Sequence, residues 1–392
     1  MRAAGLPMAL LATTAAQGLA TFTVFLLPVM APQASTTLGV GAGLLGLQMA
    51  LIYSAAACTS ALAGGALRRW GPARCTQIAL ASAAFACAAM ALGGLPGIAI
   101  GSLATGLGYG LTNPAATQVL ARLAPPARRN LVFGIKQTGV PLGGALAGLT
   151  LPTLALHLGW QGAALLAAGV IACFTLAYAP LRRHWDSARE PGFPLNSASA
   201  SGFRALREQP GLLGLAITGG CYSGLQLALS AFMVTMLVAE FGWSAVSAGL
   251  ATALVQGVGA VARLAWGWVA DRGLGGLPTL ALIGILSVLT AVAVPFATPW
   301  PPAAVLGLFA AIGFCAAGWN GVLVAEAARM AAPGRAGEAV GAAMILSFSG
   351  VVVGPSLLAA LVGLAGGYAP AFALLAALPL AGAITAWRTA SR

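Results

Sequence analysis

The sequence predicts an all-α membrane protein with twelve transmembrane helices in two pseudo-symmetric six-helix halves. Three observations support this prediction: the scarcity of charged residues, a series of long apolar runs, and a repeat at about half the chain length. Only 7% of the 392 residues are charged and 59% are hydrophobic, whereas a soluble domain carries about 25% charged residues. The composition is therefore that of an integral membrane protein.

Twelve runs are long and apolar enough to cross roughly 30 Å of hydrocarbon, which takes about 20 residues of helix. We assign the first run to a span rather than to a cleaved leader, because it is long and further spans follow it. The predicted spans cover residues 8–30, 41–64, 75–95, 97–121, 131–156, 160–180, 211–239, 245–269, 277–297, 302–326, 338–364 and 368–388.

Basic residues outside the spans occupy only the chain ends and the loops that follow even-numbered spans, such as the loop with Arg68 and Arg69 and the segment with Arg182 and Arg183. Because basic residues are retained on the cytoplasmic side, we expect a multi-pass protein of the cytoplasmic (inner) membrane with both termini in the cytoplasm. The formal charge of +12 then reflects this topology and contact with anionic lipid headgroups, and not binding of nucleic acid.

The two halves of the sequence repeat each other. Asn113 and Asn320 are equivalent positions 207 residues apart in spans 4 and 10, and Tyr53 and Gln256 are equivalent positions in spans 2 and 8. Two six-helix halves in parallel orientation place a binding site between them near the membrane midplane. The repeat therefore indicates a transporter.

The domain boundaries follow from this repeat. We expect an N-terminal six-helix half at residues 1–180, a cytoplasmic linker at 181–210 and a C-terminal six-helix half at 211–392. The linker is predicted from its polar composition and its arginines.

The loop between spans 2 and 3 resembles the loop motif of the major facilitator superfamily, and the second copy, Gly267-Trp268-Val269-Ala270-Asp271-Arg272, matches this motif better. In the family, an Asp at the fifth motif position pairs with a neighbouring helix and latches one conformation. That position is Arg68 in the first copy and Asp271 in the second, so the resemblance implies a latch in the C-terminal half. The residues assigned to the latch are Gly64, Gly71, Gly267, Asp271, Arg272 and Glu326.

Spans 5 and 11 carry glycines three or four residues apart beside a proline, which is similar to the pattern in span 5 of the superfamily's antiporters. The glycines include Gly139 and Gly143 in span 5, and Gly350 and Gly354 in span 11. Glycines at this spacing let helix backbones approach closely. We favour close packing over a signature of antiport, because 53 glycines in the chain make such spacings common.

Two basic residues lie inside predicted spans, where a charge is costly and usually functional. Lys136, in span 5, follows Arg129 by seven residues and so lies about 10 Å inside the membrane at 1.5 Å per residue. Arg263, in span 8, precedes Asp271 by eight residues, about 12 Å by the same rise. It ends a polar stripe with Gln256 on one helix face.

The sequence around Arg263 resembles span 8 of the monocarboxylate and oxalate/formate transporters in the superfamily. This resemblance implies that Arg263 contacts a substrate carboxylate. The oxalate/formate antiporters carry a second cation in span 11, where this chain has Ala343 and Met344. Lys136 in span 5 is the alternative second cation.

Structural interpretations of these charges stay open. Arg263 can pair with Glu326 near the cytoplasmic end of span 10, and both Arg263 and Lys136 can extend toward the cytoplasm along their apolar stems. Glu326 is expected to cap or latch the loop after span 10, with the binding of a coupling proton as the alternative role.

Neutral polar and aromatic residues complete the predicted cavity, and each alone is more often an interhelical contact than a ligand. The predicted substrate-binding residues are Arg263, Lys136, Gln256, Asn113, Asn320, Tyr53, Tyr109, Tyr222 and Gln17.

We therefore predict a secondary active transporter that moves a small organic anion, with a carboxylate as the leading candidate, by alternating access. The chain has no catalytic or metal-binding constellation, so neither an enzyme nor a cofactor is expected. The expected partners are the substrate, a coupling proton or other ion, and membrane lipids, and the expected state is a monomer. The alternatives are efflux of amphipathic compounds and a non-transporting sensor or scaffold with the same fold.

Overall fold

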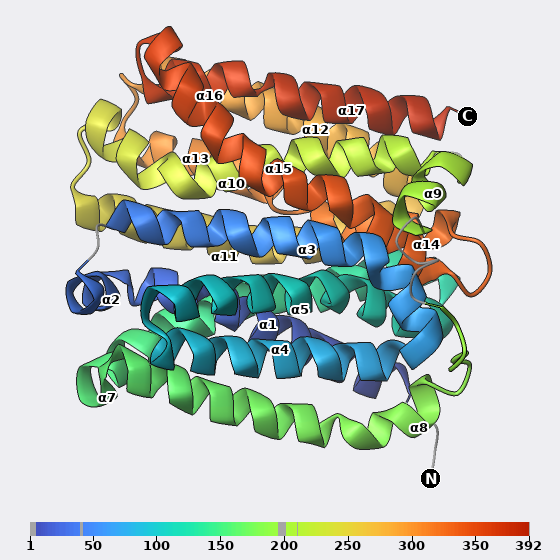
Figure 1. Cartoon of the computed structure of the whole chain (residues 1–392). Coiled ribbons are helices and arrows are strands. Elements are labelled where there is room, and N and C mark those ends of the chain that lie inside the picture. The colour runs from blue at the N-terminus through green and yellow to red at the C-terminus, as the bar shows by residue number, and fades with distance from the viewer. Residues whose placement is uncertain (1–4, 40–41, 195–200, 210, 392) are drawn as a thin grey trace. The chain divides into compact units, whose positions relative to one another are not determined.

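The computed structural model describes residues 5–39, 42–194, 201–209 and 211–391, and within these ranges the regular secondary structure is entirely helical (Figure 1). The chain ends that carry Arg2 and Arg392, and part of the predicted 181–210 linker, lie outside the described residues. The prediction of an all-α membrane class is confirmed by this architecture and by the apolar helices described next.

Ten segments among the described residues are long and apolar enough to cross a membrane. One of them, Pro126–Trp185, contains both predicted spans 5 and 6, and Gly159 interrupts its long helix α7 (Gly139–Ala177) with φ 70° and ψ 162°. The predicted span 4 corresponds to α5 (Gly94–Leu123), which is not among these ten and contains six glycines and three threonines. The total of twelve spans stays a prediction.

Two compact units make up the structure, and each draws a short stretch from the other half of the sequence. Unit 1 comprises Met1–Ala124, Lys136–Gln209 and Ala328–Ile345, and unit 2 comprises Pro125–Ile135, Pro210–Ala327 and Leu346–Arg392. The predicted division into halves at 181–210 stays a prediction.

Unit 1 is a bundle in which α4 packs on α5 and α7, α3 packs on α5, and α1 packs on α7 (Figure 1). Small residues allow the close approach: a Cβ added at Gly106 in α5 would lie 2.1 Å from the backbone oxygen of Ile52 in α3. Helices of unit 1 besides α5 and α7 are α1 (Leu6–Val29), α2 (Ala31–Leu38), α3 (Ala42–Trp70), α4 (Pro72–Leu92), α8 (Arg182–Trp185) and α9 (Ser201–Glu208).

Unit 2 is built around α17, which packs on both α10 and α12, with α11 against α13. Its core gathers large apolar side chains, among them Met236, Phe309 and Phe372. The helices with most of their residues here are α10 (Leu212–Phe241), α11 (Ala245–Val269), α12 (Gly276–Ala293), α13 (Pro302–Ala316), α14 (Trp319–Met330), α15 (Ala336–Ala365), α16 (Tyr368–Leu375) and α17 (Ala377–Ala390). The short α6 (Arg129–Gln137) begins in unit 2 and ends in unit 1.

The same glycine contact recurs in both units. In unit 1, a Cβ added at Gly143 of α7 would lie 2.2 Å from the backbone oxygen of Gly18 in α1. In unit 2, a Cβ at Gly354 of α15 would lie 2.1 Å from the backbone oxygen of Gly224 in α10. Only glycine fits such a backbone approach, so the close-packing interpretation of these glycines is confirmed.

The same glycine conformation occurs at two turns, before α4 and before α12. Gly71 precedes α4 with φ 85° and ψ 161°, and Gly275 precedes α12 with φ 76° and ψ 164°. Glycine adopts these positive φ angles without the steric cost that a side chain imposes. Gly71 is thus the residue that starts the helix after the first loop motif.

Two predicted spans are not continuous helices. The predicted span 10 is broken, because α13 ends at Ala316 and α14 begins at Trp319. In the predicted span 5, α6 ends at Gln137 and α7 begins at Gly139. Each break lies close to a buried cation, as described below.

Candidate functional site

Lys136 is the centre of a buried polar cluster in unit 1. The side chain stands at the end of α6, directly before the helix break, and is 1% exposed. Its Nζ donates hydrogen bonds to Gln17 Oε1 of α1 at 2.7 Å, to Gln137 Oε1 at 3.1 Å and to Asn113 Oδ1 of α5. The ammonium group therefore lies among amide oxygens, and it does not extend to solvent as the snorkelling alternative required.

Gln17 has a spare donor beside this charge. Its side chain is completely buried, and its orientation is fixed because Oε1 accepts from Lys136. The Nε2 group then has no hydrogen-bond partner among the described residues. A buried N–H group without a partner costs about 1–3 kcal/mol. The cluster thus offers a positive charge and an unsatisfied donor within one site, which is a suitable combination for an anion.

Asn113 links the cluster to α5, and Tyr53 and Tyr109 form an aromatic pair between α3 and α5. Asn113 Nδ2 donates to Met344 Sδ at 3.6 Å, within unit 1. The rings of Tyr53 and Tyr109 meet edge to face with centroids 6.0 Å apart, and both are buried. Such pairs contribute about 0.5–1.5 kcal/mol beyond area burial. Four of the predicted site residues of unit 1, together with Lys136, therefore lie on adjoining helices of one bundle.

Arg263 lies at the helix break in unit 2. It is 4% exposed on α11, and its Nε donates to the backbone oxygen of Ala317 at 3.1 Å, between α13 and α14. Trp266, one turn further along α11, donates from Nε1 to the backbone oxygen of Phe314 at 3.0 Å. The break frees carbonyl groups that an unbroken helix would satisfy. Arg263 and Trp266 supply donors to two carbonyls at the break.

Gly318 makes this break possible. A Cβ added at Gly318 would lie 2.2 Å from Trp266 Cδ1, so the indole can pack against the interrupted segment only when that residue is glycine. Interrupted transmembrane helices are tolerated where the surrounding protein satisfies their backbone groups, and in transporters they often mark the binding site.

Trp319 and Asn320 begin α14 directly after the break and converge on one amide. Trp319 Nε1 and Asn320 Nδ2 both donate to Gln226 Oε1 of α10, at 3.1 and 3.4 Å. Tyr222 stacks edge to face on Trp319 with centroids 6.1 Å apart, and its hydroxyl donates to the backbone oxygen of Leu280 at 2.7 Å. The predicted residues Tyr222 and Asn320 are thus joined through Gln226 and Trp319.

Gln256 is separate from these clusters. Its side chain is exposed on α11, and its predicted place in the cavity stays a prediction. In unit 2 the side chain that joins α10 to α14 by hydrogen bonds is Gln226, which accepts from Trp319 and Asn320.

Asp271 caps a helix in unit 2, where the loop motif predicted a latch. Its Oδ1 accepts from the backbone N–H of Asn130 at 3.0 Å and its Oδ2 from that of Leu131 at 2.8 Å, at the first turn of α6. A carboxylate is favoured at a helix N-terminus by both the free N–H groups and the helix dipole. Gly267 lets α11 approach, because an added Cβ would lie 2.9 Å from the backbone oxygen of Asn130.

Arg272 and Glu326 have different surroundings. The Arg272 guanidinium lies over the ring of Trp268, 4.5 Å from its centroid, in a cation–π contact. Glu326 is buried against the first turn of α12, since a Cβ added at Gly276 would lie 2.3 Å from Glu326 Oε1. Glu326 therefore lies beside α12, and its expected role at the loop after α14 stays a prediction.

The first loop motif is held by the linker. Arg68, at the position of the motif Asp, forms two hydrogen bonds with Glu190, the shorter being 2.7 Å between Nη2 and Oε2. Asp186 accepts from the backbone N–H groups of Ala73 and Arg74 at 2.7 and 3.1 Å, and so caps α4 next to Gly71. Burial raises the pKa of the Asp186 carboxyl, and these two N–H donors and Arg182 oppose that shift.

Sequence reasoning missed several of these partners. Gln137 was overlooked because it stands directly beside Lys136 in the chain, and Asp186 and Glu190 because they belong to the linker. The signal that could have found Glu190 is charge: a motif that carries Arg68 in place of Asp needs an acidic partner, and few carboxylates exist in the chain.

Comparisons with known proteins agree with this architecture. The chain matches the family profile of the Major Facilitator Superfamily over residues 13–355 and again over 229–392. A Mycobacterium tuberculosis protein described as an uncharacterized MFS-type transporter is 27% identical over 76% of this chain, and the mouse protein Monocarboxylate transporter 11 is 27% identical over 71%. The matches span 66% and 63% of these relatives' own lengths.

Solved structures resemble the chain over nearly its whole length. The E. coli fucose:proton symporter FucP has a TM-score of 0.75 at 15% identity, covering 98% of this chain and 99% of FucP. The human organic anion transporter MFSD10 has a TM-score of 0.78 at 19% identity, covering 97% of this chain and 99% of MFSD10. At these identities the likeness concerns the fold.

Proposed function

Because the chain belongs to the Major Facilitator Superfamily, whose members are transporters of small molecules, we propose that it is a secondary active transporter of a small organic anion. A carboxylate is the substrate class we favour. The observation that carries this proposal is the Lys136 cluster, where a buried ammonium group lies beside the unsatisfied Nε2 donor of Gln17. A charge placed inside a membrane helix is costly to keep unless it serves a function.

Arg263 is the second cation of the proposal. Its Nε is engaged with the Ala317 oxygen, so it positions the α13–α14 break that carries Trp319 and Asn320. A planar guanidinium presents its N–H groups in a fork that matches the two oxygens of a carboxylate. The sequence similarity to a protein named Monocarboxylate transporter 11 supports the same substrate class.

The finer features of the proposal follow the sequence predictions. The chain would cross the cytoplasmic membrane twelve times, in two pseudo-symmetric halves at residues 1–180 and 211–392. It would work as a monomer by alternating access. A proton or another ion would be the coupling partner. The runner-up function is efflux of amphipathic compounds, which the edge-to-face pair of Tyr222 and Trp319 favours.

A stability screen separates these two functions. Purified protein would be unfolded thermally in the presence of a library of carboxylates and of lipophilic cations, since a ligand that binds only the folded state raises the midpoint. We expect carboxylates to raise it saturably and lipophilic cations to leave it unchanged. The opposite pattern would favour efflux of amphipathic compounds.

Arg263→Lys is expected to lower the affinity for the substrate by about tenfold while the charge is kept, because an ammonium group lacks the fork of donors and losing one charge-assisted hydrogen bond costs about 1.5–3 kcal/mol. Binding of the best carboxylate to purified protein provides the measurement, with exposed Arg272→Lys as the control. Unchanged affinity in Arg263→Lys would assign Arg263 to the helix break alone.

Asp271→Asn is expected to lower the transport rate and leave substrate binding nearly unchanged. The substitution removes the charge that faces the N–H groups of Asn130 and Leu131, so it weakens the cap of α6 while every group that hydrogen-bonds to Lys136 Nζ is kept. Rates in proteoliposomes and affinities in detergent give the two readouts. An unaltered rate would leave the cap without a mechanical role.

Topology is tested with single cysteines in a background that lacks the six native ones. A cysteine at Thr36 should react with an impermeant thiol reagent in intact cells, whereas one at Arg183 should react only after the membrane is opened, because arginine-bearing loops are retained in the cytoplasm. Reaction in the reverse order would invert the proposed orientation.

A further inference from the structure

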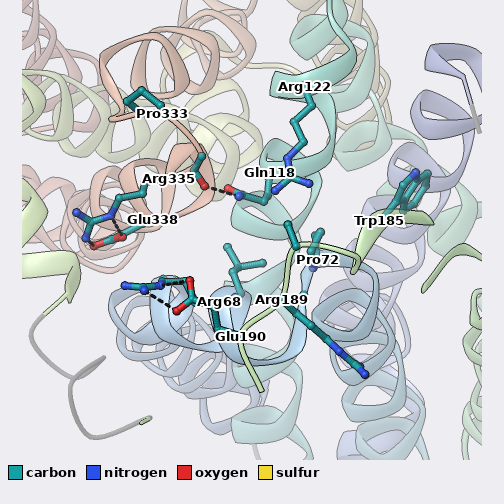
Figure 2. Close-up of a pocket in the computed structure, with 15 residues that line it drawn as sticks. Arg68, Pro72, Gln118, Arg122, Trp185, Arg189, Glu190, Pro333, Arg335 and Glu338 are labelled. Atoms are coloured by element: carbon teal, nitrogen blue, oxygen red, sulfur yellow. Dashed lines mark hydrogen bonds and ion pairs between the residues drawn. The ribbon is translucent and has the colours of Figure 1, made fainter. Parts of the chain in front are cut away.

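A cavity of about 370 Å³ lies in unit 1, away from the Lys136 cluster (Figure 2). Four stretches distant in sequence form it: the end of α3, the last turns of α5, the linker and the segment that leads into α15. The volume is within the range of small-molecule sites. The residues that line it are Gly64, Leu67, Arg68, Gly71, Pro72, Gln118, Arg122, Trp185, Ala188, Arg189, Glu190, Pro333, Gly334, Arg335 and Glu338.

The lining is strongly basic. It holds four arginines and only two glutamates. Each glutamate is engaged with one arginine: Glu190 with Arg68 at 2.7 Å and Glu338 with Arg335 at 2.6 Å. Two of the four arginine charges are balanced in this way and Arg189 interacts with Asp186, so the cavity keeps the positive charge of Arg122, which favours an anion.

Arg122 is the residue most available to a ligand. It is exposed near the end of α5 and makes no ion pair with any residue the structure describes. In Figure 2 its guanidinium points toward Gln118 and Pro72, at the centre of the labelled residues. A guanidinium presents N–H groups in a rigid fork that matches the oxygens of a phosphate.

Gln118 holds the cavity open in a fixed shape. Its Oε1 accepts from the backbone N–H of Gly337 at 2.9 Å, and its Nε2 donates to the backbone oxygen of Gly334. These bonds fix the loop that carries Pro333 and Arg335 against α5. The site is therefore preorganised, which reduces the ordering cost of binding.

We propose that this cavity binds a phosphate-bearing anion, at a site separate from the substrate cluster around Lys136. Arg122 supplies the unengaged fork, while Arg68 and Arg335 contribute positive charge from either side. Two sources carry this chemistry: free phosphate compounds of the cytoplasm, and the headgroups of anionic phospholipids. Because four separate stretches must come together to form the cavity, an occupant stabilises the folded unit.

The test uses the full-length purified protein and thermal unfolding. Inorganic phosphate is titrated against chloride at matched ionic strength, and in a parallel arm the protein is placed in nanodiscs of phosphatidylglycerol or of phosphatidylcholine. The two variants compared with the wild type are Arg122→Gln and Arg183→Gln, the latter an exposed linker arginine that does not line the cavity.

We expect the unfolding midpoint of the wild type to rise saturably with the ligand. The apparent affinity obtained from this rise should be at least tenfold lower in Arg122→Gln and unchanged in Arg183→Gln. A rise with inorganic phosphate identifies a soluble ligand, and a rise only in phosphatidylglycerol nanodiscs identifies a lipid headgroup. The proposal is overturned if the midpoint neither rises saturably with phosphate nor is higher in phosphatidylglycerol than in phosphatidylcholine nanodiscs. It is also overturned if both variants lose the rise equally, since that would indicate diffuse electrostatic attraction. These outcomes are independent of carboxylate binding at Lys136.

Discussion

Lys136→Met is expected to reduce substrate affinity by about ten- to a hundredfold. The methionine keeps the length and the apolar stem, and removes the ammonium group that donates to Gln17, Asn113 and Gln137. A charge-assisted hydrogen bond contributes about 1.5–3 kcal/mol, and each 1.4 kcal/mol corresponds to about a factor of ten in affinity. Equilibrium binding of the best-stabilising carboxylate to purified protein measures the effect.

A companion variant separates charge from shape at this position. Lys136→Arg keeps the charge, yet the side chain is 1% exposed and its Nζ already touches amide oxygens of three side chains. The larger guanidinium cannot fit without moving α1 or α5, so we expect it to impair binding as well. Normal binding by both variants would remove Lys136 from the substrate site.

Gly354→Leu is expected to prevent folding of unit 2. The backbone oxygen of Gly224 lies 2.1 Å from the position that a Cβ would take, so α15 and α10 must separate to admit any side chain. Overpacking of a core costs about 1–3 kcal/mol, and the separation of two backbones affects every contact along them. The measurement is the yield of monodisperse protein after extraction, together with its thermal midpoint.

Gly363→Leu is the matched control for Gly354→Leu. It lies in the same helix α15, and a Cβ there meets nothing within 4 Å. This variant should purify like the wild type. In α7 of unit 1, Gly148→Leu is the corresponding control for Gly143→Leu, because a Cβ at Gly148 also meets nothing within 4 Å. Equal yields from Gly354→Leu and Gly363→Leu would contradict the close packing of α15 on α10.

The fold class was predictable because the membrane imposes strong constraints on composition. Apolar runs, arginines confined to alternate loops and the repeat of Asn113 and Asn320 all reflect physical requirements that act over the whole chain. The helix breaks before Trp319 and at Thr138 were not predictable in the same way. They depend on local donors, such as Arg263 to the Ala317 oxygen, which come from helices distant in sequence.

The candidate site was predictable as a set of residues but not as a geometry. Lys136, Gln17 and Asn113 were each singled out as polar groups inside spans, yet nothing in their separation along the chain shows that one ammonium group joins them. Gln256 shares a helix face with Arg263 but is exposed where Arg263 is buried, and its place in the site stays a prediction. The pairing of Arg68 with Glu190 depends on the path of the linker, which has no periodic pattern to reveal it.

Counterflow in proteoliposomes tests the central claim most directly. Vesicles loaded with an unlabelled carboxylate and diluted into a trace of the labelled compound should accumulate the label transiently when they contain the wild-type protein. Vesicles with Lys136→Met should accumulate at most a small fraction of it, at equal protein content and with a normal thermal midpoint. Absence of carboxylate counterflow in the wild type, with counterflow of a lipophilic cation instead, would contradict transport of an organic anion.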